Sequence, residues 1–302
     1  MFVAEGAKAD GFDALRDGRD ALCAGPQPRV LLSHPKPLVP AFVVGDVHGH
    51  LDILVKLLRD AGLVDSNLRW SGRDARLWLV GDLVDRGPDG IGAIDFVMRL
   101  ETEGPVRCLL GNHEAGLLAA WRYGDAGGLA DELFRSLWEL NGGQAWDLAR
   151  FGPEHGAWIE QLPALALDGD WLLLHSDTDL YLRFGQSADE INRSISGVLS
   201  GRDPDAVDDL LGSLADRSAF RDAAVVDRVL GTLGGGRIVH GHTPIAFVTG
   251  AEPELVIEPL EYGGGRVLNV DHCLFAGGPG FVTELPAGSR DELDTKSSDT
   301  VP

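Results

Sequence analysis

The pattern of apolar and polar positions predicts a chain that alternates short buried strands with amphipathic helices. Residues 41–44, 77–80 and 106–110 are apolar runs that end at glycine, which is typical of buried strands. Apolar residues spaced three and four positions apart predict helices between them, over residues 51–61 and 91–100. Because each helix separates two strands, this series predicts an α/β fold with parallel strands and right-handed crossovers.

The second half of the chain predicts further helices and a second group of strands. Helical spacing covers residues 115–162, 187–200 and 203–233. Residues 164–167 and 171–174 flank a short polar turn and predict a hairpin. Further strands are expected at 237–240, 255–257, 266–270 and 281–285, with a tight turn at 263–265.

The helical region at residues 115–162 is rich in large apolar side chains. We expect these residues, tryptophans included, to form the core side of the helices rather than a ligand-stacking surface. The set comprises Trp121, Leu133, Phe134, Leu137, Trp138, Leu140, Trp146 and Trp158.

One domain is expected over residues 39–286, because no internal repeat or linker interrupts it. The helical regions at about 115–162 and 187–233 are interpreted as insertions within this domain. Residues 1–38 form an N-terminal extension whose prolines exclude a continuous helix. Residues 287–302 are polar and charged without periodicity, and we expect a disordered tail.

Composition limits the partners and the compartment. The net charge of −21 repels phosphate backbones and anionic membranes, so neither nucleic acid nor a membrane is expected as a partner. No apolar run approaches the roughly 20 residues that cross a bilayer, and the N-terminus lacks the pattern of a secretory signal. Cys23, Cys108 and Cys273 are scattered, which favours a reducing compartment; we expect a cytoplasmic protein.

Five predicted strands end at residues that can bind metal ions. Ligands in α/β sheets bind beyond the carboxyl ends of the strands, so these side chains are expected to converge. Each residue alone has a simpler explanation as a turn, cap or hydrogen-bonded core residue, but their coincidence at five strand ends predicts a site. The residues are Asp46 with His48, then Asp82, Asn112, His175 and His242.

The donor types divide into two sets that share one carboxylate. Asp46, His48 and Asp82 suit one cation, and Asp82 with Asn112, His175 and His242 suits a second. Mixed carboxylate, amide and imidazole ligands favour Mn, Fe or Zn over Ca. Two cations about 3.5–4 Å apart can hold the attacking and leaving oxygens of a phosphoryl displacement.

The motifs around these residues resemble those of the calcineurin-like metallophosphoesterases. GDVHG at 45–49, GDLVDRG at 81–87, GNHE at 111–114 and GHT at 241–243 occur in the family's order, with His175 before the last. The DRG and GNHE spellings resemble the phosphoprotein phosphatase branch, and the bacterial Shewanella-like phosphatases are the most similar. The resemblance, over about residues 40–285, implies a β-sandwich of mixed sheets flanked by helices, with a dinuclear metal site at the carboxyl ends of the strands.

The resemblance also implies a role for each motif residue. It assigns the metal ligands to the same two sets. It implies that His113 is the general acid at the leaving oxygen, that Asp85 orients it, and that Arg86 binds the phosphate. Substrate contacts are implied for Arg86, Asn112 and, by position, Arg221, with Arg217 as the other candidate.

The implied function is a metal-dependent phosphomonoesterase, in which hydroxide bridging two metals attacks phosphorus, acting on phosphoserine or phosphothreonine proteins. The nearest alternative is hydrolysis of dinucleoside polyphosphates or other small phosphorylated molecules. Related bacterial tetraphosphatases usually carry glutamine where this chain has His48, which favours the protein phosphatase. A non-catalytic metal-binding interaction module is a third alternative, but the motif positions are all retained.

The chain departs from the resemblance at two places. The branch usually has glycine or alanine after the His175 position, whereas this chain has Ser176 and Asp177. We interpret Asp177 as a cap of the next segment; the alternatives are an added ligand or a charge that repels the substrate. Pro244 replaces a histidine found in many phosphodiesterases of the superfamily, which favours monoester over diester substrates. His240 is expected in the core.

Overall fold

The structure is a computed structural model that describes residues 39–124 and 129–286. The predictions for residues 1–38 and 287–302 lie outside the described residues. The boundaries of the single domain and of its helical insertions stay predictions. Within the described ranges, no helix is both long enough and apolar enough to cross a bilayer.

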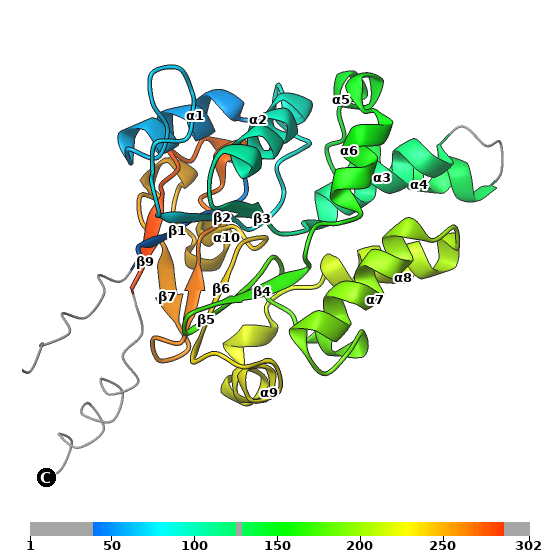
Figure 1. The fold of residues 1–302 in the computed structure, drawn as a ribbon. Coiled ribbons are helices and arrows are strands. Elements are labelled where there is room, and N and C mark those ends of the chain that lie inside the picture. The colour runs from blue at the N-terminus through cyan, green and yellow to red at the C-terminus, as the bar shows by residue number, and fades with distance from the viewer. Residues whose placement is uncertain (1–38, 125–128, 287–302) are drawn as a thin grey trace, which may run out of the picture. The chain divides into compact units, whose positions relative to one another are not determined.

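Two mixed sheets form the centre of the fold (Figure 1). In the first, β1 (Ala41–Val44), β2 (Arg76–Leu79) and β3 (Val106–Cys108) are parallel, and β9 (Thr283–Leu285) pairs antiparallel with β1. The second sheet has the order β4-β5-β6-β8-β7. Its strands are β4 (Leu165–Asp168), β5 (Trp171–Leu174), β6 (Arg237–His240), β7 (Leu260–Tyr262) and β8 (Val267–Asn269). The three central strands of this sheet are parallel, and both edge strands are antiparallel.

Helices cover the outer faces of the two sheets, which confirms the predicted sandwich flanked by helices (Figure 1). The first sheet is covered by α1 (Leu51–Asp60) and α2 (Gly90–Glu103). Between β3 and β4 lie α3 (Asn112–Tyr123), α4 (Leu129–Leu140), α5 (Ala145–Arg150) and α6 (Pro153–Ile159). Between β5 and β6 lie α7 (Ala188–Ser200), α8 (Pro204–Leu214) and α9 (Ala223–Leu233), and between β6 and β7 lies α10 (Ile245–Thr249). Short 3-10 turns are η1 (Leu180–Arg183), η2 (Ala219–Arg221), η3 (Pro253–Leu255) and η4 (Leu274–Ala276).

Successive strand residues pack into different cores. Val43 and Leu173 belong to a cluster between the sheets. Their neighbours Val44, Leu172 and Leu174 belong to the larger cluster beneath the helices. Because both faces of each sheet are covered, the strands appear in the sequence as continuous apolar runs rather than alternating ones.

One predicted strand is wrong. Residues 255–257 were expected to form a strand, but the chain there is η3 followed by irregular backbone, and Leu255 and Ile257 are both 69% exposed. Pro259 has no N–H to donate to a neighbouring strand, and the strand begins only after it, as β7.

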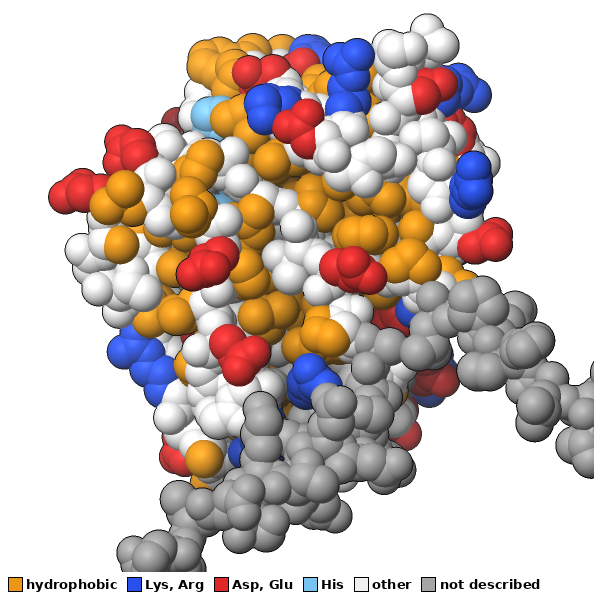
Figure 2. Space-filling model, turned by 90° about the vertical axis from the view of Figure 1, so that its left-hand side faces the viewer, with side chains coloured by type: hydrophobic (Ala, Val, Ile, Leu, Met, Phe, Trp, Pro, Cys, Tyr) orange, Lys and Arg blue, Asp and Glu red, His pale blue; other side chains and the backbone are white. Residues whose placement is uncertain are grey.

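The expectation that all large apolar residues of 115–162 are core is also wrong in part. Trp138 and Phe134 are buried, whereas Leu140 is 83% exposed and Trp146 is 52% exposed. Helix α4 packs mainly against α3, and Leu140, at the last position of the helix, lies outside that contact and is exposed. Figure 2 shows a face of the molecule on which hydrophobic side chains reach the surface between single acidic and basic ones. Such scattered exposure is ordinary for a folded protein.

Candidate active site

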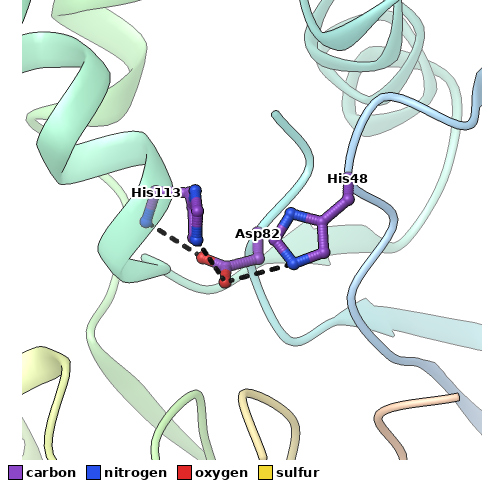
Figure 3. A group of neighbouring side chains, drawn as sticks. All are labelled: His48, Asp82 and His113. Carbon is purple, nitrogen blue, oxygen red and sulfur yellow. Dashed lines mark hydrogen bonds and ion pairs between the residues drawn. The ribbon is translucent and has the colours of Figure 1, made fainter. Parts of the chain in front are cut away.

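The carboxylate of Asp82, just beyond β2, lies at the centre of a buried group of histidines (Figure 3). Its Oδ1 atom is 3.3 Å from His175 Nε2. Its Oδ2 atom is 3.8 Å from His48 Nε2 and 3.8 Å from His113 Nε2. Residues at the strand ends of both sheets therefore meet at the carboxylate of Asp82. This convergence was expected because ligands bind beyond the carboxyl ends of the strands.

The first predicted ligand set lies on one side of Asp82. His48 Nε2 is 4.0 Å from Asp46 Oδ2. The other ring nitrogen of His48, Nδ1, is 3.0 Å from the backbone oxygen of Val84. Donation of the Nδ1 proton to that oxygen leaves the Nε2 lone pair as an acceptor, and Arg86 Nη1 lies 2.7 Å from it.

The second predicted set lies on the other side. His175 Nδ1 is 2.9 Å from the Val80 oxygen, and its Nε2 is 3.0 Å from Asn112 Oδ1. His242 Nε2 is 3.2 Å from the Ala215 oxygen, which leaves its Nδ1 as the atom available to a ligand. The rings of His175 and His242 are 5.0 Å apart.

The chemistry of these donors fits metal ions. Each histidine of the two sets directs one ring nitrogen at a backbone oxygen, which is how metal-binding histidines are usually oriented. Donor atoms of His48, Asp82 and His113 lie within 4.8 Å of one another, and so do those of Asp82, His175 and His242. These groups can hold metal ions, and the assignment of each residue to an ion stays a prediction.

The electrostatics of the cluster also suit a cation. Burial raises the pKa of the Asp82 carboxyl, but the charges of His175 and His113 outweigh it and hold that pKa well below its usual range. Burial lowers the pKa of His175, yet the carboxylates of Asp82 and Asp46 raise it to about 10. Asp46 has its pKa raised by burial and then by the neighbouring Asp271. A cation would relieve this repulsion between buried carboxylates.

Five of the site residues have left-handed backbone, which is unfavourable for residues other than glycine. This conformation is retained where surrounding contacts over-determine it, and it clusters at functional sites. The residues are His48 (φ 47°), Asp82 (φ 53°), Asp85 (φ 67°), Arg86 (φ 65°) and His242 (φ 64°).

Glu114 holds this strained backbone in place. Its fully buried carboxylate accepts hydrogen bonds from the N–H groups of Asp82, Leu83 and Gly111. Burial raises the pKa of Glu114 to about 7. Gly111 is required by close approach, because a Cβ there would lie 2.2 Å from Asp82 Oδ1.

The predicted acid, its orienting residue and the phosphate ligand are in contact. His113 Nδ1 is 2.7 Å from Asp85 Oδ2. Arg86 Nη1 is 2.7 Å from His48 Nε2, and its Nη2 is 2.9 Å from His113 Nε2. The guanidinium carbon also lies 4.4 Å from the centre of the Phe275 ring.

A cleft of about 300 Å³ opens from these residues between α4 and α8. Arg86, Asn112, His113 and Arg217 are among the residues that line it. Its lining also includes apolar side chains and one carboxylate: Phe134, Leu137, Trp138, Leu211 and Asp208.

The geometry favours Arg217 over Arg221 as the second phosphate ligand. Arg217 lines the cleft, and its charge reaches His242, whose pKa is lowered by burial first and by His175 and Arg217 in addition. Arg221, the residue chosen by position, is exposed in η2 and is not among the residues that line the cleft. Which of the two arginines lines the cleft has no signal in the residue spacing.

The residues after His175 have structural roles. Asp177 Oδ1 accepts a hydrogen bond from Thr243 Oγ1 at 2.5 Å, and Oδ2 accepts one from the Ser218 N–H at 2.8 Å. Both oxygens thus fasten distant segments, the GHT motif and the residue before η2, and Asp177 does not cap the segment that follows it, because the N-cap of η1 is Asp179. His240 is buried, as expected, with Nε2 2.7 Å from the Tyr262 hydroxyl.

Sequence reasoning missed several residues of the site. Asp271 is buried near Asp46 and follows β8, so it is one more strand-end carboxylate that the same rule could have found. Glu114 lies within a recognised motif but had no role assigned. Trp138 and Phe275 approach the site from distant segments, and nothing in their sequence neighbourhood indicates it.

Comparison with known proteins identifies related sequences. Residues 39–246 match the family described as calcineurin-like phosphoesterase. Serine/threonine-protein phosphatase 1 of Salmonella typhimurium is 34% identical over 132 residues, which cover 44% of this chain and 51% of that protein. The symmetrical bis(5'-nucleosyl)-tetraphosphatase of Enterobacter sp. is 31% identical over 160 residues, which cover 53% of this chain and 50% of that protein. The chain spans about half the length of these curated relatives.

Among solved structures, the cold-active protein-tyrosine phosphatase of a psychrophilic Shewanella species is similar with a TM-score of 0.62. The sequences are 22% identical, and the match covers 82% of this chain and 75% of that one. At this level of identity the similarity establishes a shared fold.

Proposed function

The chain belongs to the calcineurin-like phosphoesterase family, and we propose that it is a metal-dependent phosphomonoesterase acting on phosphoserine or phosphothreonine side chains of proteins. The observation that carries this proposal is the cleft beside His113. Its lining combines the side chains proposed to bind phosphate with apolar walls.

The proposed cofactor is a pair of metal ions, Mn, Fe or Zn, held by the two ligand sets that share Asp82. When bound, the ions supply positive charge at the phosphate and lower the pKa of a water molecule near phosphorus. The chain's own residues bind the substrate and donate a proton to the leaving oxygen.

Arg86 is the proposed phosphate ligand. Its two terminal nitrogens form a planar fork that suits two oxygens of one phosphoryl group. One arm of that fork is 2.9 Å from His113 Nε2, so a phosphate held by Arg86 has its ester oxygen close to the histidine. Arg217, which lines the same cleft, is the proposed second ligand.

His113 is the proposed proton donor to the leaving oxygen. The hydrogen bond between its Nδ1 atom and Asp85 fixes the ring, so that Nε2 is the nitrogen that faces the proposed phosphate ligand and would donate the proton. This donation matters most for alkyl leaving groups such as serine, because an alkoxide is a far stronger base than an aryl oxide.

The cleft beyond the phosphate favours a monoester over a polyphosphate. Among its lining residues, Arg86 and Arg217 carry permanent positive charge, whereas Leu137 and Leu211 are apolar and Asp208 is acidic. A peptide that carries a phosphorylated side chain can use these walls. The additional phosphates of a dinucleoside tetraphosphate would meet the carboxylate of Asp208 instead.

Hydrolysis of dinucleoside polyphosphates is the second candidate, since relatives of about 31% identity carry that name. A direct comparison of kcat/KM for a phosphoserine peptide and for diadenosine tetraphosphate separates the two. We expect the peptide to be preferred, and preference for the nucleotide would overturn the proposal.

A charge reversal in the cleft sharpens that comparison. Asp208→Lys places a cation where the polyphosphate chain would lie, and should raise relative activity on the nucleotide several-fold. Asp205→Lys is the matched control, because Asp205 is an exposed residue of the same helix and does not line the cleft. It makes the same change in net charge without altering the cleft.

A further inference from the structure

Helix α4 and the turn after it touch two of the proposed catalytic residues. The Trp138 indole nitrogen donates a hydrogen bond to Asp85 Oδ1 at 2.8 Å. The Gly142 oxygen accepts a hydrogen bond from the Arg86 N–H at 2.7 Å. This segment lies more than 50 residues after Asp85 and Arg86 along the chain. It nevertheless contacts the side chain of Asp85 and the backbone of Arg86.

The Asp85 carboxylate has one partner for each oxygen. Oδ2 bonds to His113 Nδ1 at 2.7 Å, and Oδ1 accepts the Trp138 N–H. The side chain is fully buried, so burial raises its pKa, and the two hydrogen bonds act against that rise. Without Trp138, Oδ1 would be a buried acceptor without a partner, or the carboxylate would turn away from His113.

The turn after α4 is shaped around these contacts. Asp85 and Arg86 both have left-handed backbone. Gly142 has φ 103°, and a Cβ there would lie 2.6 Å from Arg86 Cγ. A Cβ on Gly143 would lie 2.3 Å from the Trp138 ring. Because neither glycine has a Cβ, the turn can lie directly against Arg86 and Trp138.

We propose that Trp138 is a positioning residue for proton donation: its indole N–H fixes the Asp85 carboxylate, which in turn fixes the His113 ring. This inference rests on the proposed function, because it assigns His113 the role of proton donor. Trp138 also connects the cleft with His113, because Trp138 and its neighbour Leu137 both line the cleft.

A second tryptophan provides a matched control. Trp158 Nε1 donates a hydrogen bond of the same length, 2.8 Å, to Glu101 Oε2, and Trp158 packs against the main core. Neither Trp158 nor Glu101 lines the cleft. Trp138→Phe and Trp158→Phe each remove one indole N–H and keep an aromatic ring, so the two variants differ in which carboxylate loses its donor.

The first test compares an alkyl phosphate with p-nitrophenyl phosphate, whose leaving group needs little proton donation. We expect Trp138→Phe to lower kcat/KM for the alkyl ester about 10-fold, a fraction of the 10²–10⁴-fold typical of a general acid, with much less effect on the aryl ester. Trp158→Phe should leave the ratio of the two substrates unchanged. Equal losses on both substrates in Trp138→Phe would overturn the proposal.

A double-mutant cycle tests whether Trp138 acts through Asp85. If it does, adding Trp138→Phe to Asp85→Asn should cause almost no further change in the ratio of alkyl to aryl hydrolysis. Independent, additive losses would show that Trp138 affects the reaction by another route, and would contradict the inference.

A spectroscopic test does not depend on turnover. In protein labelled with 15N-histidine, the proton on His113 Nδ1 should give a downfield resonance that Asp85→Asn removes. Trp138→Phe should shift this resonance or accelerate its exchange with water, and Trp158→Phe should not. An unchanged resonance in Trp138→Phe overturns the positioning role, whereas absence of turnover in the wild-type protein with the resonance shifted as expected overturns only the proposed function.

Discussion

Asp82 Oδ1 lies 3.3 Å from His175 Nε2, and this contact joins the two sheets of the sandwich. Asp82 follows β2 in the first sheet, and His175 follows β5 in the second. The other oxygen of Asp82 is directed at His48 and His113. One carboxylate thus reaches histidines of both predicted ligand sets.

Replacing Asp82 should remove metal binding and activity together. In Asp82→Asn one carboxylate oxygen becomes an amide nitrogen, which cannot act as a ligand, and the negative charge between the histidines is lost. We expect metal affinity to fall more than about 100-fold, beyond the 10–100-fold typical of losing an outer-shell partner. Metal content after dialysis, measured by mass spectrometry, tests this. Retention of two metal ions per chain would contradict the bridging role.

Asp85→Asn should separate metal binding from proton donation. Asp85 contacts His113 and Trp138 rather than the ligand sets, so metal content should equal that of the wild-type protein. Hydrolysis of an alkyl phosphate should fall on the order of 100-fold, with a smaller loss for p-nitrophenyl phosphate. The ratio of kcat values for the two esters measures this difference, and a uniform loss would argue against an acid role for His113.

The two candidate arginines can be distinguished by a matched pair of substitutions. Arg217 lines the cleft, whereas Arg221 does not, although only four positions separate them. Arg217→Ala should raise KM for a phosphopeptide about 10-fold, which corresponds to about 1.4 kcal/mol of binding free energy. Arg221→Ala should leave KM near the wild-type value. A larger effect at Arg221 would restore the assignment made by position.

Acid stability should depend on His272. This ring is fully buried, neither of its nitrogens has a hydrogen-bond partner, and its edge meets Phe281 with 5.1 Å between ring centres. Burial lowers the pKa of His272 to about 3, below its value in an unfolded chain. The unfolded state therefore binds the proton first, and stability that is present above about pH 6.5 is lost as the pH falls towards 3.

The comparison with His272→Leu isolates this contribution. Between about pH 6 and 4, the wild-type protein should lose about 1.4 kcal/mol of unfolding free energy per pH unit more than His272→Leu. Urea unfolding at several pH values measures the difference. Parallel pH profiles for the two proteins would mean that the buried ring does not resist protonation.

Local pattern was sufficient to predict the elements that carry the site. The runs before Asp46, Asp82 and Asn112 are apolar because both faces of the sheet are covered, and that property is visible residue by residue. Pattern failed at residues 255–257, where three apolar residues resemble a strand but the chain forms η3 and then irregular backbone. It also failed for Leu140, because apolar spacing marks a helix face without indicating whether another element covers it.

The sequence by itself determined the donors and the motifs: which carboxylates and imidazoles end the strands, and hence the class of chemistry. Only the tertiary structure decided which side chains from distant segments reach them. Trp138 meets Asp85 through the packing of α4, and Arg217 rather than Arg221 lines the cleft. The physical reason is that strand-end geometry repeats every two residues and is local, whereas the position of a helix or turn depends on the packing of the whole chain.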